Sequence, residues 1–386
     1  QIVTVRSEEK TFEQSYGKLL IATGAHAVSE PIEGSSLDGV FTMHHMDAAG
    51  ALRAYLMPPS MVDAATFDGK YIDRDRVETY ADKKPPESAA VVGGGYVGVE
   101  MAEALRAHDL DVHLFQRPEQ LLPPFGSAVG DHVAETLQNH EVAVHLGSEV
   151  EAMIGEDHVA GVRFDGSQIQ TDLVLLGIGI RPNTELIQET AIKCGDSGAI
   201  MTDKFGRTNV DDIYAAGDCA EMRHTVTGEL TWVPLGLTAN RAGRAIGNTV
   251  AGSPTPVGDI AGTAVVKAFE TECGRTGILD LDKARSTGFD PISKTITASS
   301  RSGYYPGAED TTVTLVADQT SGQLLGGSIV GADRAAIRID TIATALENEM
   351  TVDELERSDL AYAPPFSPVW DPILVAAKVL NGALTE

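Results

Sequence analysis

The stretch that most constrains the fold is Ala89–Glu103, which reads AAVVGGGYVGVEMAE. Its first four residues are small or β-branched and predict a buried parallel strand. Gly93, Gly95 and Gly98 then give G-x-G-x-x-G, and the residues that follow continue at helical spacing. In order, these glycines permit a tight turn, allow backbone to approach a pyrophosphate and let the helix pack closely on the strand. The first helical turn offers free N–H groups to phosphates. The stretch therefore predicts a dinucleotide site, with Tyr96 and Val97 beside the glycines.

The residues around this motif alternate between strand and helix patterns. This alternation, with one antiparallel β excursion, predicts a doubly wound α/β domain. The expected strands are 89–92, 111–115, 142–146 and 173–176, the helices 98–107 and 129–139, and the excursion 160–164 with 168–170.

The rest of the chain predicts further elements on both sides of this domain. Residues 1–24 indicate two strands separated by a polar turn, Met46–Leu56 a helix, and 58–86 a polar surface segment. After the domain come a short strand, a helix, a linker and a β-rich segment that ends in helices, which predicts a separate α+β domain. These later elements are expected at 213–216, 237–250, 252–254, 264–269, 292–299, 312–317, 323–329, 335–346 and 352–358, before a final helix.

The charge balance is strongly acidic. Asp and Glu number 56 against 29 Lys and Arg, giving a formal net charge of −27. Such a field repels nucleic acid and anionic membrane surfaces, so neither is an expected partner. Because the acidic residues are spread along the chain, we interpret the composition as a halophilic-type solubility adaptation, since high salt shortens the range of self-repulsion.

Three cysteines, Cys194, Cys219 and Cys273, lie far apart and fit neither a disulfide framework nor a zinc site. They favour a reducing, cytoplasmic location, and no metal is expected. The sequence has no apolar run of transmembrane length and no leader pattern, which predicts no membrane partner. Because it begins at Gln1 with a strand-like segment, we expect a fragment or a processed form.

The nicotinamide coenzyme is indicated by the end of the second strand. A carboxylate about twenty residues after the first glycine binds the ribose diol in NAD sites. Here the strand reads VHLFQR, which puts Gln116 and Arg117 at that position. A guanidinium binds phosphate in a bidentate way, so we expect NADPH to be accepted beside NADH. The alternative is that Arg117 is a solvated surface charge.

Four segments in order resemble one family: KLLIATGA (18–25), VVGGGYVGVEMAE (91–103), IYAAGDCAE (213–221) and YAPPFSPVWDP (362–372). Together they resemble FAD-dependent pyridine-nucleotide disulfide oxidoreductases. Within these, the chain is similar to the branch that holds coenzyme A disulfide reductases and NADH oxidases. The resemblance covers nearly the whole chain.

The resemblance implies two Rossmann-like nucleotide-binding domains and a C-terminal α+β dimerisation domain. FAD would be bound by 1–45 with 206–255, NAD(P)H by 46–205, and 260–386 would form the dimer. It also implies that the first FAD motif and the redox cysteine precede Gln1. The FAD domain would then be incomplete, and we expect the sequence as given to bind FAD poorly and to be inactive alone.

The resemblance further implies roles for particular residues. Thr23, Gly24, Gly217 and Asp218 would bind FAD, with the carboxylate accepting hydrogen bonds from ribityl hydroxyls. The helix from Leu237 would direct its N-terminus at the flavin pyrimidine, and Gly179 would lie beside the nicotinamide. None of the three cysteines lies in the context of the family's redox thiol; Cys219 and Cys273 are interpreted as core residues.

Two tyrosines complete the implied site. Tyr304 (or Tyr305) and Tyr362 match residues that approach the substrate disulfide from the partner subunit, which implies a homodimer. The implied reaction passes hydride from NAD(P)H through FAD to a disulfide, with coenzyme A disulfide as the leading substrate. An NADH oxidase, a persulfide or polysulfide reductase, and a non-catalytic nucleotide-binding or dimerisation module remain as alternatives.

Overall fold

The computed structural model describes residues 1–7, 10–29, 32–57 and 84–385. The chain forms two compact units, one of residues 1–26 with 180–262 and one of 27–179 with 263–386. Most of the surface segment expected at 58–86 lies outside the described residues. Each unit is described by itself below.

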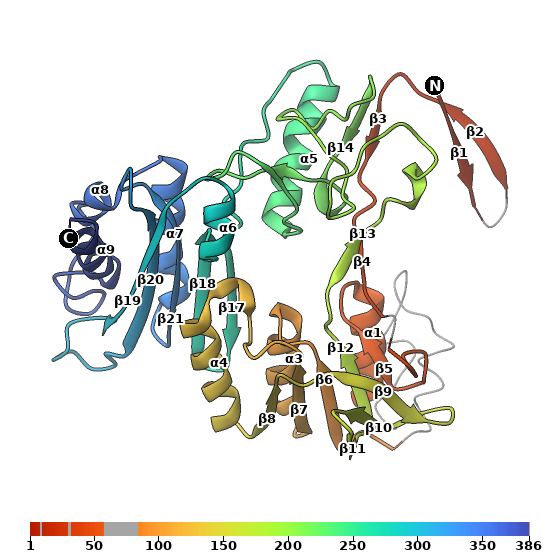
Figure 1. Cartoon of the computed structure of the whole chain (residues 1–386). Helices are drawn as coiled ribbons and strands as arrows, with labels where there is room; N and C mark the ends of the chain where they lie inside the picture. The colour runs from red at the N-terminus through yellow and green to blue at the C-terminus, as the bar shows by residue number, and fades with distance from the viewer. Residues whose placement is uncertain (8–9, 30–31, 58–83, 386) are drawn as a thin grey trace. The chain divides into compact units, whose positions relative to one another are not determined.

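A five-stranded parallel sheet holds the glycine motif in the larger unit (Figure 1). Its central strand β6 is buried from Ala89 to Val92, as the apolar run predicts. The predicted α/β fold is confirmed here, and helix α1 spans the predicted residues. In sheet order the strands are β5 (Val40–Thr42), β12 (Leu173–Leu176), β6 (Ser88–Val92), β7 (Asp111–Gln116) and β8 (Val142–Leu146), and the helices are α1 (Met46–Leu56), α3 (Tyr96–Arg106) and α4 (Ser127–Asn139).

The position of β5 differs from the expected domain boundaries. We expected residues 1–45 to form part of the FAD-binding domain. In the structure β5 pairs in parallel with β12, at the edge of the sheet that carries the motif. Residues 180–205, expected in the NAD(P)H domain, belong to the smaller unit. Short strands such as Val40–Thr42 carry no sequence signal for their partner, because pairing depends on residues far along the chain.

The β excursion is an antiparallel three-stranded sheet of β9 (Val150–Gly155), β10 (Val159–Phe164) and β11 (Ser167–Gln170). Strand β9 was not predicted from the sequence. Buried residues of the excursion, including Met153 and Val162, share one apolar cluster with Phe115 of β7 and Val174 of β12. The excursion therefore covers part of the parallel sheet.

The C-terminal part is a second, antiparallel sheet with helices, as the α+β prediction states. Helix α7 packs on β18 and β21, and helix α9 packs on β19 and β20. The order is β17 (Ala264–Ala268), β18 (Thr271–Gly277), β21 (Leu324–Gly331), β20 (Asp310–Asp318) and β19 (Pro291–Ser299), with α6 (Leu281–Ser286), α7 (Ala335–Glu347), α8 (Val352–Glu356) and α9 (Pro372–Leu384).

The smaller unit is built on the parallel pair β3 (Leu19–Ile21) and β14 (Ile213–Ala215), with helix α5 (Gly236–Val250). Alanines of α5 pack with Tyr214 and Ala216 in one core cluster. A hairpin of β1 (Ile2–Arg6) and β2 (Thr11–Ser15) occupies residues where the sequence indicated one strand and a turn. All five residues of β2 are exposed, so no apolar alternation marks the strand. The remaining strands are β4 (Ala25–Ala27), β13 (Ile180–Pro182), β15 (Met222–Arg223) and β16 (Leu230–Thr231).

Among the residues that the structure describes, no helix combines the length and the apolar character that crossing a bilayer requires.

A pair of histidines lies on neighbouring strands of the parallel sheet. His113 Nδ1 lies 3.0 Å from His145 Nε2, and the His145 ring stacks on Phe115 at a centroid distance of 4.5 Å. Burial, and secondarily the charge of His113, lower the pKa of His145 below its usual value near 6.5. The folded protein therefore favours the neutral ring.

This lowered pKa predicts that acid destabilises the fold through His145. The contribution is fully present above about pH 6.5 and is lost as the pH falls through the lower folded pKa, because only the unfolded chain gains the proton readily. His145→Phe keeps the stack, so we expect its free energy of unfolding to fall less than the wild type's between pH 7.5 and 5. Urea unfolding at both pH values measures this, with exposed His132→Gln as the control. An equal loss in His145→Phe and wild type would contradict the prediction.

Candidate functional site

The turn after β6 requires glycine at two positions. Gly93 has a φ of 108°, and its N–H donates to Phe115 O at 2.8 Å. A Cβ on Gly98 would lie 1.7 Å from Gly93 O, so the helix can approach the turn only without a side chain. A Cβ on Gly95 would meet nothing within 4 Å. The turn is therefore closely packed at Gly93 and Gly98 and open at Gly95, which fits a pyrophosphate approaching the backbone there.

Helix α3 begins immediately at this open position. Its N-cap is Gly95, which provides no side-chain cap, and its first turn, which includes Val97, contains no acidic residue. The N–H groups are thus available to an anion. The Tyr96 ring packs edge-on against Phe125, and its hydroxyl lies 3.3 Å from Arg275 Nε, which donates to it.

The loop after β12 lies against the same turn. Gly177 N–H donates to Val92 O at 2.8 Å, and a Cβ on Gly93 would come within 2.4 Å of Gly177 O. Gly179 follows two residues later with a φ of 118° and open space on its Cβ side. The carboxyl ends of β6 and β12 therefore bring the motif close to the loop that ends at Gly179, as adjacent parallel strands do.

Gln116 contacts the turn from the end of β7. Its Oε1 accepts from Gly94 N–H at 2.8 Å, and its Nε2 donates to Gln120 O at 3.0 Å. The residue is 8% exposed. We expected Gln116 to be one of the residues that bind NAD(P)H. In the structure the amide oxygen accepts from a buried backbone N–H and the amide nitrogen donates to a partly buried carbonyl, so Gln116 holds the glycine turn in place.

Arg117 is placed differently from its neighbour. Its side chain is 77% exposed and lies 3.8 Å from the Glu149 carboxylate, measured from Nη1 to Oε1. Exposed ion pairs at this separation are weak, typically below about 1 kcal/mol. The guanidinium can therefore exchange this carboxylate for a phosphate at little cost.

The four predicted FAD residues lie on two neighbouring loops of the smaller unit. Thr23 and Gly24 follow β3, and Gly217 and Asp218 follow β14. The two strands are parallel, and Ala216 N–H donates to the carbonyl of the last β3 residue at 3.0 Å. Both loops therefore leave the same edge of the pair, where open α/β sheets bind ligands.

Asn183 fastens the first of these loops, a role that sequence reasoning missed. Its Nδ2 donates to Thr23 O at 2.8 Å, and its carbonyl O accepts from Thr23 Oγ1 at 2.6 Å. Its backbone N–H donates to Gly24 O at 2.9 Å, and its Oδ1 lies 2.5 Å from His26 Nδ1. Because Asn183 is some 160 residues away in the chain, only the turn around it could be recognised from the sequence.

Asp218 presents its carboxylate without a protein partner among the described residues, while Trp232 Nε1 donates to its backbone O at 2.8 Å. Gly217 adopts a φ of 77°. Helix α5, after N-cap Leu235, has no side-chain cap and no acid in its first turn. An unpaired carboxylate and an uncapped helix N-terminus fit a cofactor with hydroxyl groups and an electron-rich ring system. The residues present therefore fit FAD.

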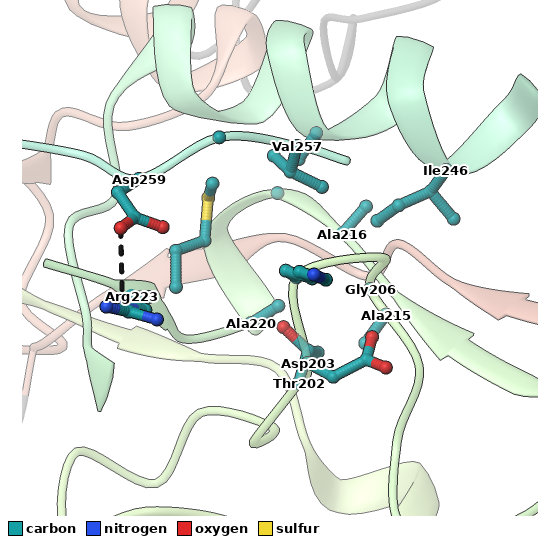
Figure 2. A pocket seen from close by; sticks show the side chains of 15 residues that line it. Thr202, Asp203, Gly206, Ala215, Ala216, Ala220, Arg223, Ile246, Val257 and Asp259 are labelled. Carbon is teal, nitrogen blue, oxygen red and sulfur yellow. Dashed lines mark ion pairs between the residues drawn. The ribbon is translucent and has the colours of Figure 1, made fainter. Parts of the chain in front are cut away.

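Figure 2 shows a pocket in this unit, next to the second loop. Ala215, Ala216 and Gly217 line it, and the ion pair between Arg223 and Asp259, 3.4 Å from Nε to Oδ2, stands at its side. The pocket therefore adjoins the second predicted FAD loop through Gly217, while Thr23 and Asp218 lie outside its lining.

The cysteines have structural surroundings. Cys219 is buried, and its Sγ donates to Ala216 O and Ile21 O at 3.3 and 3.6 Å. Burial raises the pKa of Cys273 to about 12. Cys194 is exposed, yet partial burial and the charge of Glu221 also raise its pKa. A redox-active thiol needs the opposite shift, so these last two have no sign of activation.

The predicted tyrosines lie on two segments of the C-terminal part that touch each other. Tyr304, Tyr305 and Tyr362 are 79%, 37% and 49% exposed. Between the segments, Ser302 N–H donates to Pro364 O at 3.3 Å. The structure therefore brings these phenols onto adjacent exposed loops.

Comparison with known proteins identifies the family. Residues 1–236 match the model of pyridine nucleotide-disulphide oxidoreductases, and residues 263–372 match the dimerisation domain of the same family. The NAD(P)H coenzyme A polysulfide/persulfide reductase of Pyrococcus horikoshii is 37% identical over 373 residues, which are 97% of this chain and 77% of the relative.

Two solved structures are also similar. The NAD-dependent persulfide reductase from A. fulgidus superposes with a TM-score of 0.87 at 30% identity, covering 99% of this chain and 66% of that one. The reduced Bacillus anthracis CoADR-RHD gives 0.86 at 29%, covering 100% and 65%. This chain spans about two thirds of each solved chain.

The family matches confirm the predicted Rossmann-type and dimerisation folds, and the dimerisation domain supports a homodimer. Members of the family use FAD and NAD(P)H. The chain belongs to the pyridine nucleotide-disulphide oxidoreductases, the FAD-dependent NAD(P)H oxidoreductases that its sequence resembles.

Proposed function

We propose that this protein reduces a disulfide with NAD(P)H and that coenzyme A disulfide is its substrate. The observation that carries the proposal is the pair of exposed tyrosine segments joined on the dimerisation domain. The glycine turn and the two loops after β3 and β14, which we propose bind the two nucleotides, support it. An enzyme that only passed electrons to oxygen would have no need of phenols at a thiol-binding site.

FAD, when bound, supplies the relay of two electrons between the nicotinamide and the disulfide. The residues of this chain would bind and orient the two nucleotides. The open turn at Gly95 and the N-terminus of α3 would bind the nicotinamide nucleotide. Thr23 and Gly24 on one loop, and Gly217 and Asp218 on the other, would hold FAD.

The tyrosines supply the proton chemistry in this proposal. Breaking a disulfide releases a thiolate, and a positioned phenol can protonate it or hydrogen-bond to it as charge develops. Tyr304 and Tyr362 are exposed and lie on the part of the chain that matches the dimerisation domain. We propose that they reach the substrate site of the partner subunit, so that the active site is shared across a two-fold axis.

A second candidate is reduction of a persulfide or polysulfide. It is favoured by the names of two similar proteins, at 37% and 30% identity. Both reactions cleave a sulfur–sulfur bond and release a thiolate or sulfide, so the same phenols would serve either. Reduction of oxygen would use the same nucleotide sites but not the phenols.

An anaerobic comparison of acceptors tests the proposal. The kcat/KM with NADPH is measured for coenzyme A disulfide, for coenzyme A persulfide and, after admission of air, for oxygen. We expect turnover without oxygen and the highest kcat/KM with coenzyme A disulfide. A higher value for the persulfide would favour the second candidate, and turnover in air alone would contradict both.

The position of Arg117 predicts that the protein accepts NADPH as well as NADH. If its guanidinium binds the 2′-phosphate, Arg117→Gln should lower kcat/KM for NADPH by roughly 10- to 100-fold, the range expected for losing one charge-assisted contact of about 1.5–3 kcal/mol. The value for NADH should hardly change. Glu149→Gln, which removes the competing carboxylate, should raise kcat/KM for NADPH. Equal losses with both coenzymes in Arg117→Gln would contradict this role.

A further inference from the structure

We propose that Arg338 is a positioning residue that fixes the Tyr304 segment and the Tyr362 segment relative to each other. This inference rests on the proposed disulfide reduction. Arg338 lies on α7 (Figure 1). Its hydrogen bonds go to backbone carbonyls and to Asp371 rather than to a phenol, so it would act through the backbone of the two segments.

The guanidinium of Arg338 links both segments at one nitrogen. Nη2 donates to Ser300 O at 2.6 Å and to Phe366 O at 3.2 Å. Ser300 precedes Tyr304 by four residues, and Phe366 follows Tyr362 by four. Among the described residues, one hydrogen bond joins the two segments directly, from Ser302 N–H to Pro364 O at 3.3 Å. Arg338 adds a second connection, because one nitrogen donates to both segments.

The other donors of Arg338 are used as well. Nε donates to Asp371 Oδ2 at 3.1 Å, and Nη1 donates to Asp333 O and Arg334 O at 3.0 and 3.4 Å. A guanidinium has five N–H donors in a rigid fork, and all five have an acceptor here. Lysine, with three donors on a single nitrogen, cannot reproduce this set.

Charge balance keeps the guanidinium in place. The side chains of Arg338 and Asp371 are 10% and 11% exposed, so the charges compensate each other away from bulk water. Asp371 also accepts from Ser367 Oγ at 3.1 Å and from Ile373 N–H at 3.0 Å, which anchors it at the start of α9.

A second ion pair stiffens the tyrosine loop on its other side. Arg301 Nε donates to Asp333 Oδ2 at 2.8 Å. Burial raises the pKa of Asp333, but hydrogen bonds from Arg301 and Ser300 outweigh it and hold that pKa below its usual range. Asp333 therefore stays ionised and ties the loop to the same cluster as Arg338.

The consequence for the reaction is geometric. Two phenols that serve one sulfur–sulfur bond must keep their separation, and a misplacement of about 1 Å can cost about 10²-fold in rate. Both tyrosines are exposed, and among the described residues neither hydroxyl has a hydrogen-bond partner that could hold it individually. Their spacing is therefore set by the backbone, and Arg338 sets the backbone.

The test uses Arg338→Lys in the full protein with FAD, which keeps the charge beside Asp371. We expect kcat with coenzyme A disulfide to fall by about 10- to 100-fold. The NADPH-dependent reduction of a small quinone, which needs no phenol, should be unchanged. Amide hydrogen exchange should become faster in residues 300–309 and 360–367 together. The matched control is Arg357→Lys, at an exposed arginine that pairs with Asp353 on the same domain.

If Arg338→Lys does not fold, the double variant Arg338→Gln with Asp371→Asn removes both charges together, and asparagine can still cap α9. The same losses are expected. If the wild type reduces the disulfide and the variant shows the same kcat and the same hydrogen exchange as the wild type, the inference about Arg338 is wrong and the proposed function is unaffected. Absence of disulfide reduction in the wild type would instead overturn the proposed function.

Discussion

Gly98→Ala is expected to abolish NAD(P)H-dependent turnover and to lower the free energy of unfolding by about 1–3 kcal/mol, the range of forced overpacking. The added Cβ would lie 1.7 Å from Gly93 O and 2.9 Å from its carbonyl carbon. Neither atom belongs to a flexible side chain, so the turn itself must move. Gly93 is fixed on its other side by Gly177 and by Phe115 O, which leaves no easy direction of escape.

Gly95→Ala is the matched control for this effect. Its Cβ would meet nothing within 4 Å, and the φ of −85° suits alanine. We therefore expect wild-type stability but a KM for NAD(P)H that rises by about 10-fold or more, because the methyl group occupies the side from which pyrophosphate approaches. Urea unfolding and steady-state kinetics distinguish the two variants. Wild-type stability in Gly98→Ala would contradict this description of the turn.

Tyr362→Phe is expected to lower kcat with coenzyme A disulfide by about 10²-fold, the lower range for a general acid. Tyr304→Phe should have a similar effect. The change removes one oxygen from a half-exposed ring, so the fold should be unaffected. Reduction of a quinone by NADPH should stay at the wild-type rate, since it releases no thiolate.

The neighbouring tyrosine provides the control for this prediction. Tyr305→Phe changes the neighbouring phenol, which is less exposed than Tyr304. Tyr305→Phe should leave kcat unchanged if Tyr304 is the acid. If Tyr305 is the acid instead, Tyr305→Phe should lower kcat and Tyr304→Phe should not. Full activity in all three variants would exclude a catalytic role for these phenols.

The parts of the fold that could be predicted are those with local signals. The apolar run before Gly93 and the helical spacing of Met46–Leu56 depend only on neighbours in the sequence, and both elements lie where expected. Strands β2 and β9 were missed because neither has an alternating pattern of buried and exposed residues. Residues of β2 are all exposed, while β9 mixes buried and exposed residues without strict alternation. Both form because a partner strand lies beside them, which a local pattern does not reveal.

The candidate site was predictable to the same extent. The glycines have a backbone role that their spacing reveals, and the structure gives Gly93, Gly98 and Gly95 distinct packing. The roles of Gln116 and Asn183 could not be predicted, because each depends on which backbone groups are left without partners nearby. Gln116 accepts a hydrogen bond from the glycine turn and lies on a neighbouring strand, and Asn183 donates one to a loop far away in the chain. The nucleotide and tyrosine assignments themselves stay predictions.

The most direct test of the central claim is an anaerobic stoichiometry. NADPH is mixed with limiting coenzyme A disulfide and the protein, and both NADPH oxidation and free thiol are measured without oxygen. Because reduction of one disulfide takes the two electrons and the proton of one hydride together with one further proton, we predict two thiols for each NADPH oxidised. Oxidation of NADPH that waits for the admission of air and releases no thiol would contradict the account.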